Sequence, residues 1–311
     1  MTSRTGGEIQ DVSDTAIWVA YYRAQETERP DAIFRDPLAK RLIGDRGAQI
    51  AARFGAVGRY TAWTLVSRTV IIDDYILEAV AAGVDAVVNL GAGLDTRPYR
   101  MKLPADLQWV EADFPHMVDY KDRMLATETP RCRLQRVGVD LADAVARRGF
   151  LASVVPDAKK VLVLTEGVIP YLTEAQVADL ATDLRVQPRI ALWIGEYFAP
   201  AVYGYLKAAT RSRVMANAPF QFFPTEWLGF FAQHGWVKKE IRYGSQVAMR
   251  YRRMPPMPWW GRIMMKFASP ERIAQARTMT GYLLMEPQSG SPSADRDAGY
   301  PAWLRDSRTC L

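Results

Sequence analysis

Histidine and cysteine are scarce in this sequence. Among its 311 residues, His116 and His234 are the only histidines, and Cys132 and Cys310 are the only cysteines. The two cysteines form no Cys-x-x-Cys pair, whereas a disulfide framework or a zinc site needs several such residues at short spacing. We therefore expect no bound metal and no disulfide framework, and most histidine-dependent catalysis is excluded.

Long apolar runs are also missing. A helix that crosses a bilayer needs about 20 consecutive apolar residues, and no stretch of the sequence approaches that length. Residues 1–14 carry neither the basic start nor the apolar segment of a secretory signal. With 49% hydrophobic and 24% charged residues, the composition is that of an ordinary soluble globular protein. We expect it to reside in the cytoplasm.

Positive charge is concentrated near the C-terminus. The formal net charge is +6, yet residues 238–277 contain ten basic and two acidic side chains, a local net charge of +8. Such a segment can attract nucleic acid or an anionic membrane surface. No recognisable nucleic-acid-binding module accompanies it, and charge runs usually form a solvated face. We therefore expect no nucleic-acid partner.

From residue 85 onward, short apolar runs alternate with helical patterns. The runs cover residues 87–90, 108–113, 134–139, 161–164 and 190–197. The polar ends of the first four follow one another at intervals of 22 to 27 residues, about the length of one strand–helix unit. This pattern predicts an α/β fold with a doubly wound, mostly parallel sheet that helices cover on both faces.

The sequence also indicates how the chain is organised around this sheet. Helical patterns over residues 14–23, 36–42 and 60–80 predict a helical N-terminal extension or lid over residues 1–80. The sheet domain is expected over residues 81–286, with strands near 236–243 and 278–285 and lid insertions at about 198–224 and 252–277. Residues 287–311 are rich in Ser, Asp, Gly and Pro and predict a flexible tail.

Glycines or acids end four of the five predicted strands. These residues are Gly91 with Gly93, Asp113, Asp140 and Glu166. In open α/β sheets, ligands bind outside the carboxyl ends of the strands. Each acid alone could cap a helix, but their regular recurrence favours a ligand site at this edge.

The glycine loop indicates which nucleotide binds there. Gly91 and Gly93 allow a ligand to approach the backbone closely. A dinucleotide site would carry a third glycine where this sequence has Thr96, and Asp95 places negative charge where a pyrophosphate would lie. These features argue against NAD. They suit S-adenosylmethionine (SAM), which has no phosphate and carries a sulfonium and an ammonium group.

The remaining acids fit the other parts of SAM. A ribose ligand is expected about 20 residues after the glycines, and strand geometry alone leaves Glu111 and Asp113 as alternatives. Asp140 can accept a hydrogen bond from the adenine amino group, and Leu141 can cover the ring.

Several motifs together resemble the leucine carboxyl methyltransferase family. They are Arg-Ala-Gln-Glu at 23–26, Phe-Arg-Asp-Pro-Leu-Ala at 34–39, Arg-Thr at 68–69, Ile-Asp-Asp at 72–74, the glycine loop with its strand at 87–97, Glu-Ala-Asp-Phe-Pro at 111–115, Asp-Leu at 140–141 and Thr-Glu-Gly-Val-Ile-Pro-Tyr-Leu at 165–172. The resemblance covers about residues 14–286 and is greatest to a bacterial branch that includes polyketide O-methyltransferases of the tetracenomycin type. It implies the Rossmann-like fold of class I SAM methyltransferases.

The resemblance also implies roles for individual residues. Arg68 would pair with the SAM carboxylate, and Gly91 would contact the cofactor through its backbone. Asp113, rather than Glu111, would bind the ribose. Asp140 and Leu141 would contact the adenine, and Glu166 would contact the methionine end. The expected product is S-adenosylhomocysteine (SAH).

No motif indicates the methyl acceptor, but the ionisation of its functional group favours one class. A carboxylate is already ionised at neutral pH and needs no base, whereas a phenol would gain from one. We therefore expect O-methylation of a carboxylate, or of a phenol, on a small molecule of natural-product type. Tyr171 and Tyr197 follow sheet ends and are expected to position the acceptor. Further candidates for the acceptor wall are Tyr21, Tyr22, Tyr203, Arg211 and Trp227.

Two alternatives stay open. The chain could methylate the C-terminal carboxylate of a protein, as founding members of the resembled family do, or it could be a nucleotide-binding module without catalysis. The sequence does not indicate the oligomeric state.

Overall fold

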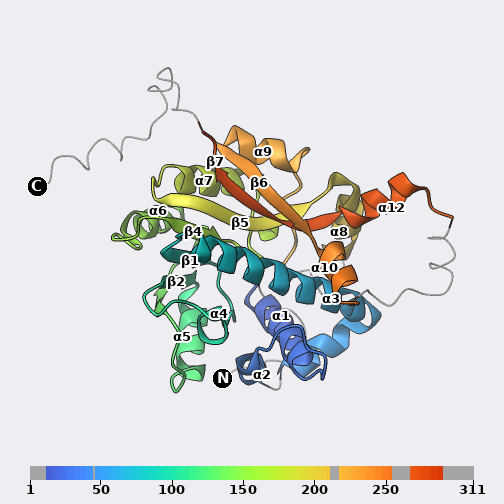
Figure 1. Cartoon of the computed structure of the whole chain (residues 1–311), viewed down its shortest axis with the longest axis horizontal. Coiled ribbons are helices and arrows are strands. Elements are labelled where there is room, and N and C mark those ends of the chain that lie inside the picture. Colours follow the sequence, from blue (N-terminus) through green and yellow to red (C-terminus); the bar gives the residue numbers. More distant parts are fainter. Residues whose placement is uncertain (1–11, 45, 211–216, 254–266, 290–311) are drawn as a thin grey trace, which may run out of the picture.

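The computed structural model describes residues 12–44, 46–210, 217–253 and 267–289 (Figure 1). The helices are α1 (Val12–Thr27), α2 (Pro37–Ile43), α3 (Arg46–Ala81), α4 (Arg97–Arg100), α5 (Pro115–Met124), α6 (Ala144–Ser153), α7 (Glu174–Arg185), α8 (Tyr203–Thr210), α9 (Trp227–Gln233), α10 (Gly244–Arg250) and α12 (Pro270–Arg277). The strands are β1 (Ala86–Leu90), β2 (Gln108–Asp113), β3 (Arg133–Gly138), β4 (Val161–Leu164), β5 (Ile190–Phe198), β6 (Trp236–Tyr243) and β7 (Thr280–Pro287). Two short 3-10 helices, η1 (Ile169–Tyr171) and η2 (Pro200–Val202), follow β4 and β5.

These strands form one sheet in the order β3-β2-β1-β4-β5-β7-β6. β1 to β5 pair in parallel, and β7 pairs antiparallel with both β5 and β6. The predicted doubly wound, mostly parallel sheet is therefore confirmed. Strand order reverses between β1 and β4, and a sheet of this kind binds ligands at the carboxyl ends of the strands beside that reversal.

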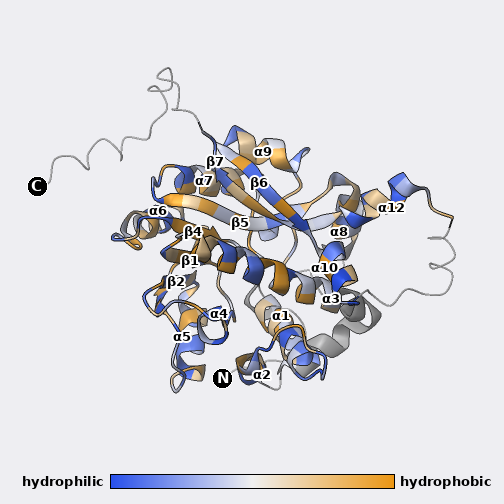
Figure 2. Ribbon diagram, viewed as in Figure 1, coloured by the Kyte–Doolittle hydropathy of each residue, from blue (hydrophilic) through white to orange (hydrophobic). Residues whose placement is uncertain are grey.

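Both faces of the sheet are buried. Successive strand residues point to opposite faces, so Val88 packs with Phe150 of α6 and with residues of α7 and α9. Val87 packs on the other face with Ile72 and Ile76 of α3. The alternating hydrophilic and hydrophobic turns of α3 are visible in Figure 2. Because helices cover both faces, the parallel strands appear in the sequence as continuous apolar runs.

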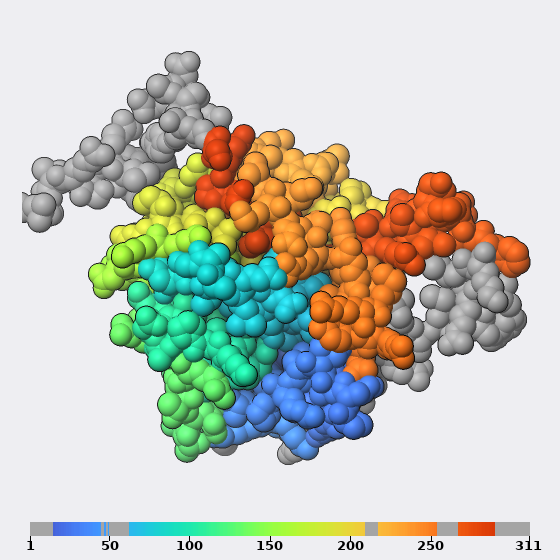
Figure 3. Space-filling view, viewed as in Figure 1, coloured from blue at the N-terminus to red at the C-terminus, as the bar shows by residue number. Residues whose placement is uncertain are grey.

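The first two helices, α1 and α2, pack beside the sheet rather than on its faces. Residues of α1 and α2 form a cluster with Leu94 of the glycine loop and Met117 of α5. Figure 3 shows these helices (blue) against the green segment that contains α5. Buried Arg23 of α1 donates from Nε to Oδ2 of Asp36, the N-cap of α2, over 2.8 Å. This arrangement holds α1 next to the carboxyl edge of the sheet.

Some boundaries differ from the prediction. α3 begins at Arg46 rather than near residue 60. The sequence did not predict its first turns because they contain Gly47, Gly55 and Gly58, and glycine disfavours helix interiors. β7 extends to Pro287, so the predicted tail begins inside a strand. Residues 290–311, and 211–216 and 254–266 of the predicted insertions, lie outside the described residues. The helix α10, directly after β6, was not predicted.

Acidic side chains compensate part of the basic segment. Arg242 pairs with Glu78 and Glu240 at 2.6 and 2.7 Å, and Arg253 lies 2.8 Å from Asp31. Arg250 and Arg252 remain exposed at the surface. In the described ranges, no helix combines the length and apolar character needed to span a membrane.

Candidate active site

A cavity of about 230 Å³ lies at the carboxyl ends of β1 and β4. Its walls come mainly from the loops that follow the first four strands, from α1, from Arg68 of α3 and from Met117 of α5. The lining residues that bear on the chemistry are Thr15, Ala16, Val19, Arg23, Arg68, Asn89, Gly91, Gly93, Asp95, Asp113, Phe114, Asp140, Leu141, Glu166, Gly167, Val168 and Tyr171. The structure thus brings every predicted cofactor residue to one cavity, beside the reversal of strand order.

The glycine loop is shaped so that backbone lines the cavity. Gly91 and Gly93 have φ angles of 67° and 47°, a region that side-chain-bearing residues rarely adopt. A Cβ at Gly91 would collide with Val168 Cγ2, and one at Gly93 would lie 3.0 Å from Ala16 Cβ. Any larger residue at these positions would therefore displace neighbouring walls of the cavity.

Asp113 is bound to this loop. Its Oδ2 accepts a hydrogen bond from Gly93 N over 2.5 Å, and its Oδ1 accepts one from Phe114 N over 2.7 Å. Burial raises the pKa of the Asp113 carboxyl, and the two N–H groups oppose that rise. Each oxygen keeps a further lone pair, so the carboxylate can still accept hydrogen bonds from a diol in the cavity.

Glu111, the alternative ribose ligand, faces a different environment. Its Oε2 lies 2.8 Å from Lys121 Nζ and 2.8 Å from Arg136 Nε. The side chain is buried against α5 and β3 and does not line the cavity. Geometry therefore favours Asp113, because Asp113 is the last residue of β2 and Glu111 lies within the strand.

Asp140 and Leu141 form the wall of the cavity that follows β3. Asp140 Oδ1 accepts a hydrogen bond from Ala142 N over 2.9 Å, which fixes the turn after β3. The Leu141 carbonyl accepts one from Arg147 Nη1 over 2.7 Å. Both residues line the cavity, and their contacts with adenine stay a prediction.

A buried group of charges forms the opposite end. Glu166 accepts from Arg68 Nε over 2.5 Å with Oε1, and from Arg97 Nη1 over 2.6 Å with Oε2. Burial alone would raise the pKa of Glu166, but the two guanidinium groups hold it well below its usual range. The carboxylate is therefore ionised at neutral pH and sits beside the cationic Arg68.

Asp95 is not the free negative charge that the sequence suggested. Its Oδ2 accepts from Arg97 Nη1 over 2.8 Å and from Asn89 Nδ2 over 2.9 Å. Arg97 therefore compensates much of the negative charge that would repel a pyrophosphate from this loop. The role of Arg97 was missed, although this residue directly follows the glycine loop in the sequence.

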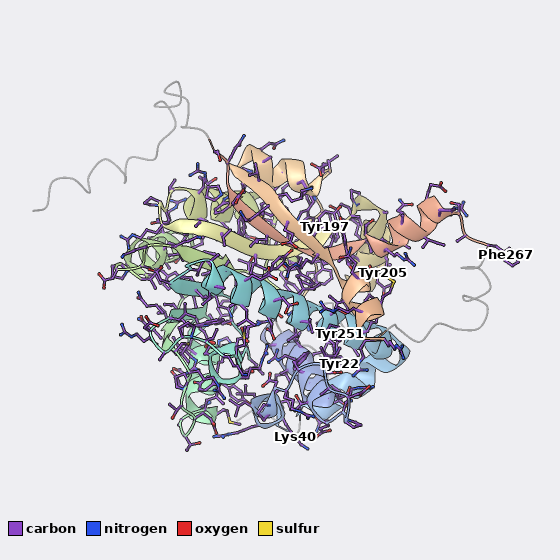
Figure 4. The ribbon with its side chains drawn as sticks, in the orientation of Figure 1. Tyr22, Lys40, Tyr197, Tyr205, Tyr251 and Phe267 are labelled. Atoms are coloured by element: carbon purple, nitrogen blue, oxygen red, sulfur yellow. The ribbon has the colours of Figure 1, made fainter. Side chains whose placement is uncertain are left out.

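The predicted acceptor residues separate into two groups. Tyr171 lines the cavity, and its ring centroid lies 5.1 Å from that of Phe220. Tyr197 does not line the cavity; its ring contacts Trp227 and Tyr243, at 6.4 and 6.2 Å between centroids. Figure 4 shows Tyr197 well apart from Tyr22 of α1. This geometry gives no support to Tyr197 as an acceptor contact.

The other candidates for the acceptor wall are held by packing. Tyr203 donates from its hydroxyl to the Pro224 carbonyl over 2.9 Å, and Trp227 belongs to the aromatic core. Tyr22 is buried and packs edge-on against Tyr21 and Trp18, beside the cavity wall that α1 provides. Arg211 lies outside the described residues.

Comparison with known proteins identifies the family. Residues 16–184 match the family model for leucine carboxyl methyltransferase. A Parafrankia protein named as a SAM-dependent methyltransferase is 37% identical over 186 residues, covering 56% of this chain and 58% of the relative. Relatives of the same name from Frankia alni (30% identity) and Streptomyces coelicolor (32%) match 78% and 75% of this chain, and 90% and 88% of their own lengths.

A solved structure has the same fold. It is a DUF574 family protein from Streptomyces avermitilis, with a TM-score of 0.51, 15% identity and coverage of 86% of this chain and 96% of that protein. The chain therefore belongs to the leucine carboxyl methyltransferase family, as its motifs indicated. It is a SAM-dependent methyltransferase, and the prediction of SAM as cofactor is confirmed.

Proposed function

We propose that the chain transfers the methyl group of SAM to an oxygen atom of a small-molecule acceptor, and that this oxygen belongs to a carboxylate. The observation that carries the proposal is the cavity itself. It has Asp113 at one end, the Arg68–Glu166 pair at the other, and no histidine among its described lining residues.

The chemistry of the lining residues fits SAM. Asp113 would bind the ribose hydroxyls, and Asp140 and Leu141 would bind and cover the adenine. Arg68 has donor groups beyond the Nε that Glu166 uses, so it can bind the cofactor carboxylate while Glu166 accepts from the ammonium group. Gly91 and Gly93 would let the backbone approach the cofactor between these ends.

The protein would contribute alignment and exclusion of water. SAM, when bound, supplies a methyl group on a cationic sulfur, and in-line attack by the acceptor oxygen forms the C–O bond as the C–S bond breaks. Thr15, Ala16 and Val19 of α1 line the cavity, so we infer that α1 acts as a lid that shields this step from water. No proton has to leave a carboxylate acceptor.

Tyr171 is the lining residue best placed to orient the acceptor. Burial raises the pKa of its hydroxyl to about 12, so at neutral pH the group is a hydrogen-bond donor rather than a base. Its ring continues into a small cluster with Trp18 and Phe220, which favours a planar, apolar acceptor body such as an aromatic natural product.

Methyl-labelled SAM can distinguish the acceptor classes. We would incubate the protein with paired aromatic compounds that differ only in a carboxylate or a hydroxyl group, and then treat the products with alkali. Methyl esters release volatile methanol under these conditions and methyl ethers do not. Alkali-labile label supports a carboxylate acceptor, and alkali-stable label would show a phenol instead.

Two further arms of this experiment serve as controls. At a SAM concentration that half-saturates the wild-type protein, Asp113→Ala should transfer far less label to any compound. Peptides with a free C-terminal carboxylate should remain unlabelled, and their labelling would favour a protein acceptor. Location in the cytoplasm and a role in secondary metabolism stay predictions.

A further inference from the structure

A second buried carboxyl lies behind the Arg68–Glu166 pair. Glu196, near the end of β5, is 3% exposed. Its Oε1 accepts a hydrogen bond from Gly167 N, the residue that follows Glu166. Its Oε2 is buried and has no hydrogen-bond partner within the described part of the chain. No wall of the cavity includes Glu196, so the residue does not face the ligand directly.

Glu196 and Arg68 lie on either side of the Gly167 turn. Gly167 has a φ angle of 72°, and a Cβ there would lie 3.5 Å from Arg68 Nη2. The Arg68 guanidinium therefore packs against the turn, while Glu196 holds the N–H of the same turn. Glu196 is 3% exposed and the Arg68 side chain 14% exposed, so a change in the charge of Glu196 acts on Arg68 with little screening by water.

The charged and titratable groups around Glu196 come from three other elements and one loop. They are Arg68 of α3, Glu166 of the loop after β4, Tyr171 of η1 and Tyr282 of β7. Burial raises the pKa of Glu196 to about 7, even though Arg68 and the Gly167 N–H lower it. Arg68 is already paired with Glu166, so it compensates a second carboxylate only in part.

We propose that Glu196 is a positioning residue for the amino-acid end of SAM. As a neutral acid it holds the Gly167 turn and leaves Arg68 available to the cofactor carboxylate, whereas as a carboxylate it competes with the cofactor for Arg68. This inference rests on the proposed placement of the methionine end at Arg68 and Glu166.

The sign of the resulting pH dependence follows from linkage. A ligand carboxylate next to Arg68 disfavours the ionised form of Glu196, so binding takes up a proton near pH 7. The affinity for SAH is then highest when Glu196 is neutral and falls as the pH rises. If the ligand raises the pKa of Glu196 by about one unit, the affinity falls about tenfold between pH 5.5 and 8.5.

The test is calorimetric titration of SAH into the wild-type protein and Glu196→Gln across this pH range. The glutamine keeps an acceptor for Gly167 N and stays neutral. We expect the wild-type affinity to fall about tenfold and Glu196→Gln to keep the low-pH affinity throughout. Equal pH dependence in both proteins would overturn the proposal.

5′-Methylthioadenosine provides the matched ligand control. It keeps the adenine and ribose of SAH but has no amino-acid end, so its affinity should not change with Glu196. Asp113 lies at the proposed ribose end of the cavity, so a change in its ionisation would affect both ligands alike. A fall in affinity that 5′-methylthioadenosine shares would therefore contradict a role for Glu196.

A measurement on the wild-type protein alone covers the case in which Glu196→Gln does not fold. Titration at pH 7 in two buffers of different ionisation enthalpy reports proton uptake. We expect uptake with SAH and none with 5′-methylthioadenosine, and no uptake with SAH would overturn the proposal. Failure of SAH to bind at any pH is a separate result, which would reject the cofactor placement and this inference together.

Discussion

Arg68 on α3 donates from Nε to Oε1 of Glu166 over 2.5 Å, although 98 residues separate them in the chain. The pair joins the long helix to the loop after β4 and places a cation and an anion at one end of the cavity. A zwitterionic amino-acid group needs both charges. We therefore expect Arg68→Ala and Glu166→Gln each to weaken SAH binding by about tenfold to hundredfold, and to change the affinity for 5′-methylthioadenosine far less, as measured by calorimetry.

Asp113 should be required for every ligand that contains the ribose. Its removal deletes the proposed acceptor of both hydroxyls and frees Gly93 N, so Asp113→Ala is expected to lose about tenfold to hundredfold in affinity for SAH and for 5′-methylthioadenosine. Asp119→Ala is the matched control, because that acid is exposed on the neighbouring α5. Equal affinities for the two variants would argue against a ribose site at Asp113.

Gly91 should tolerate no side chain. Gly91→Ala combines a φ angle of 67° with a collision at Val168, so we expect a loss of about 1 to 3 kcal/mol in the free energy of unfolding together with impaired SAH binding. Gly149→Ala in α6 meets no atom within 4 Å and should be neutral or stabilising by up to about 1 kcal/mol. Urea unfolding compares the two, and similar losses at both sites would refute the steric explanation.

The buried charges around Arg97 should matter for stability more than a surface pair. Arg97→Ala would leave Asp95 and Asp73 without the guanidinium that they share, at a cost of about 3 to 5 kcal/mol in the free energy of unfolding. Arg41→Ala breaks the exposed pair with Glu128 and should cost less than about 1 kcal/mol. Urea titration measures the stability of the two variants. A loss of less than about 1 kcal/mol for Arg97→Ala would mean that water solvates the Asp95 and Asp73 carboxylates.

Ionisation of buried Glu196 should lower the free energy of unfolding as the pH rises. Burial raises its pKa in the folded protein to about 7, from the ordinary glutamate value of 4.5. The folded state therefore binds the proton more tightly than the unfolded state, and the stability that this confers is complete below pH 4.5 and is lost as the pH rises through 7. Glu196→Gln removes this loss, so its advantage over wild type should grow to about 3 kcal/mol at pH 8. A constant difference between pH 4 and pH 8 would show that Glu196 does not titrate in this range.

Much of the fold was predictable because each parallel strand is a short apolar run with a polar end. β4 has the predicted bounds, 161–164, and the glycines and acids at the strand ends meet in one cavity. The first turns of α3 could not be predicted, because three glycines lower the helix propensity of that segment. Packing of α3 against α1 stabilises the helix in the folded protein.

Sequence spacing could not distinguish on which side of a strand end each side chain lies. Glu196 and Tyr197 end the fifth strand, and successive residues point to opposite faces. The aromatic ring of Tyr197 favoured it as a site residue, but Tyr197 packs in the aromatic core, and Glu196 lies close to Arg68 and Glu166. Arg23 of α1 donates from Nη2 to the Leu94 carbonyl of the glycine loop over 2.5 Å. This contact joins α1 to the cavity wall, and no periodicity in the sequence reveals it.

A crystal structure of the protein with SAH would test the central claim most directly. We expect the ribose hydroxyls on Asp113, the adenine amino group on Asp140 with Leu141 against the ring, and the amino-acid end at Arg68 and Glu166, with Tyr171 facing the sulfur. SAH bound outside this cavity, or with its ribose on Glu111, would contradict the account.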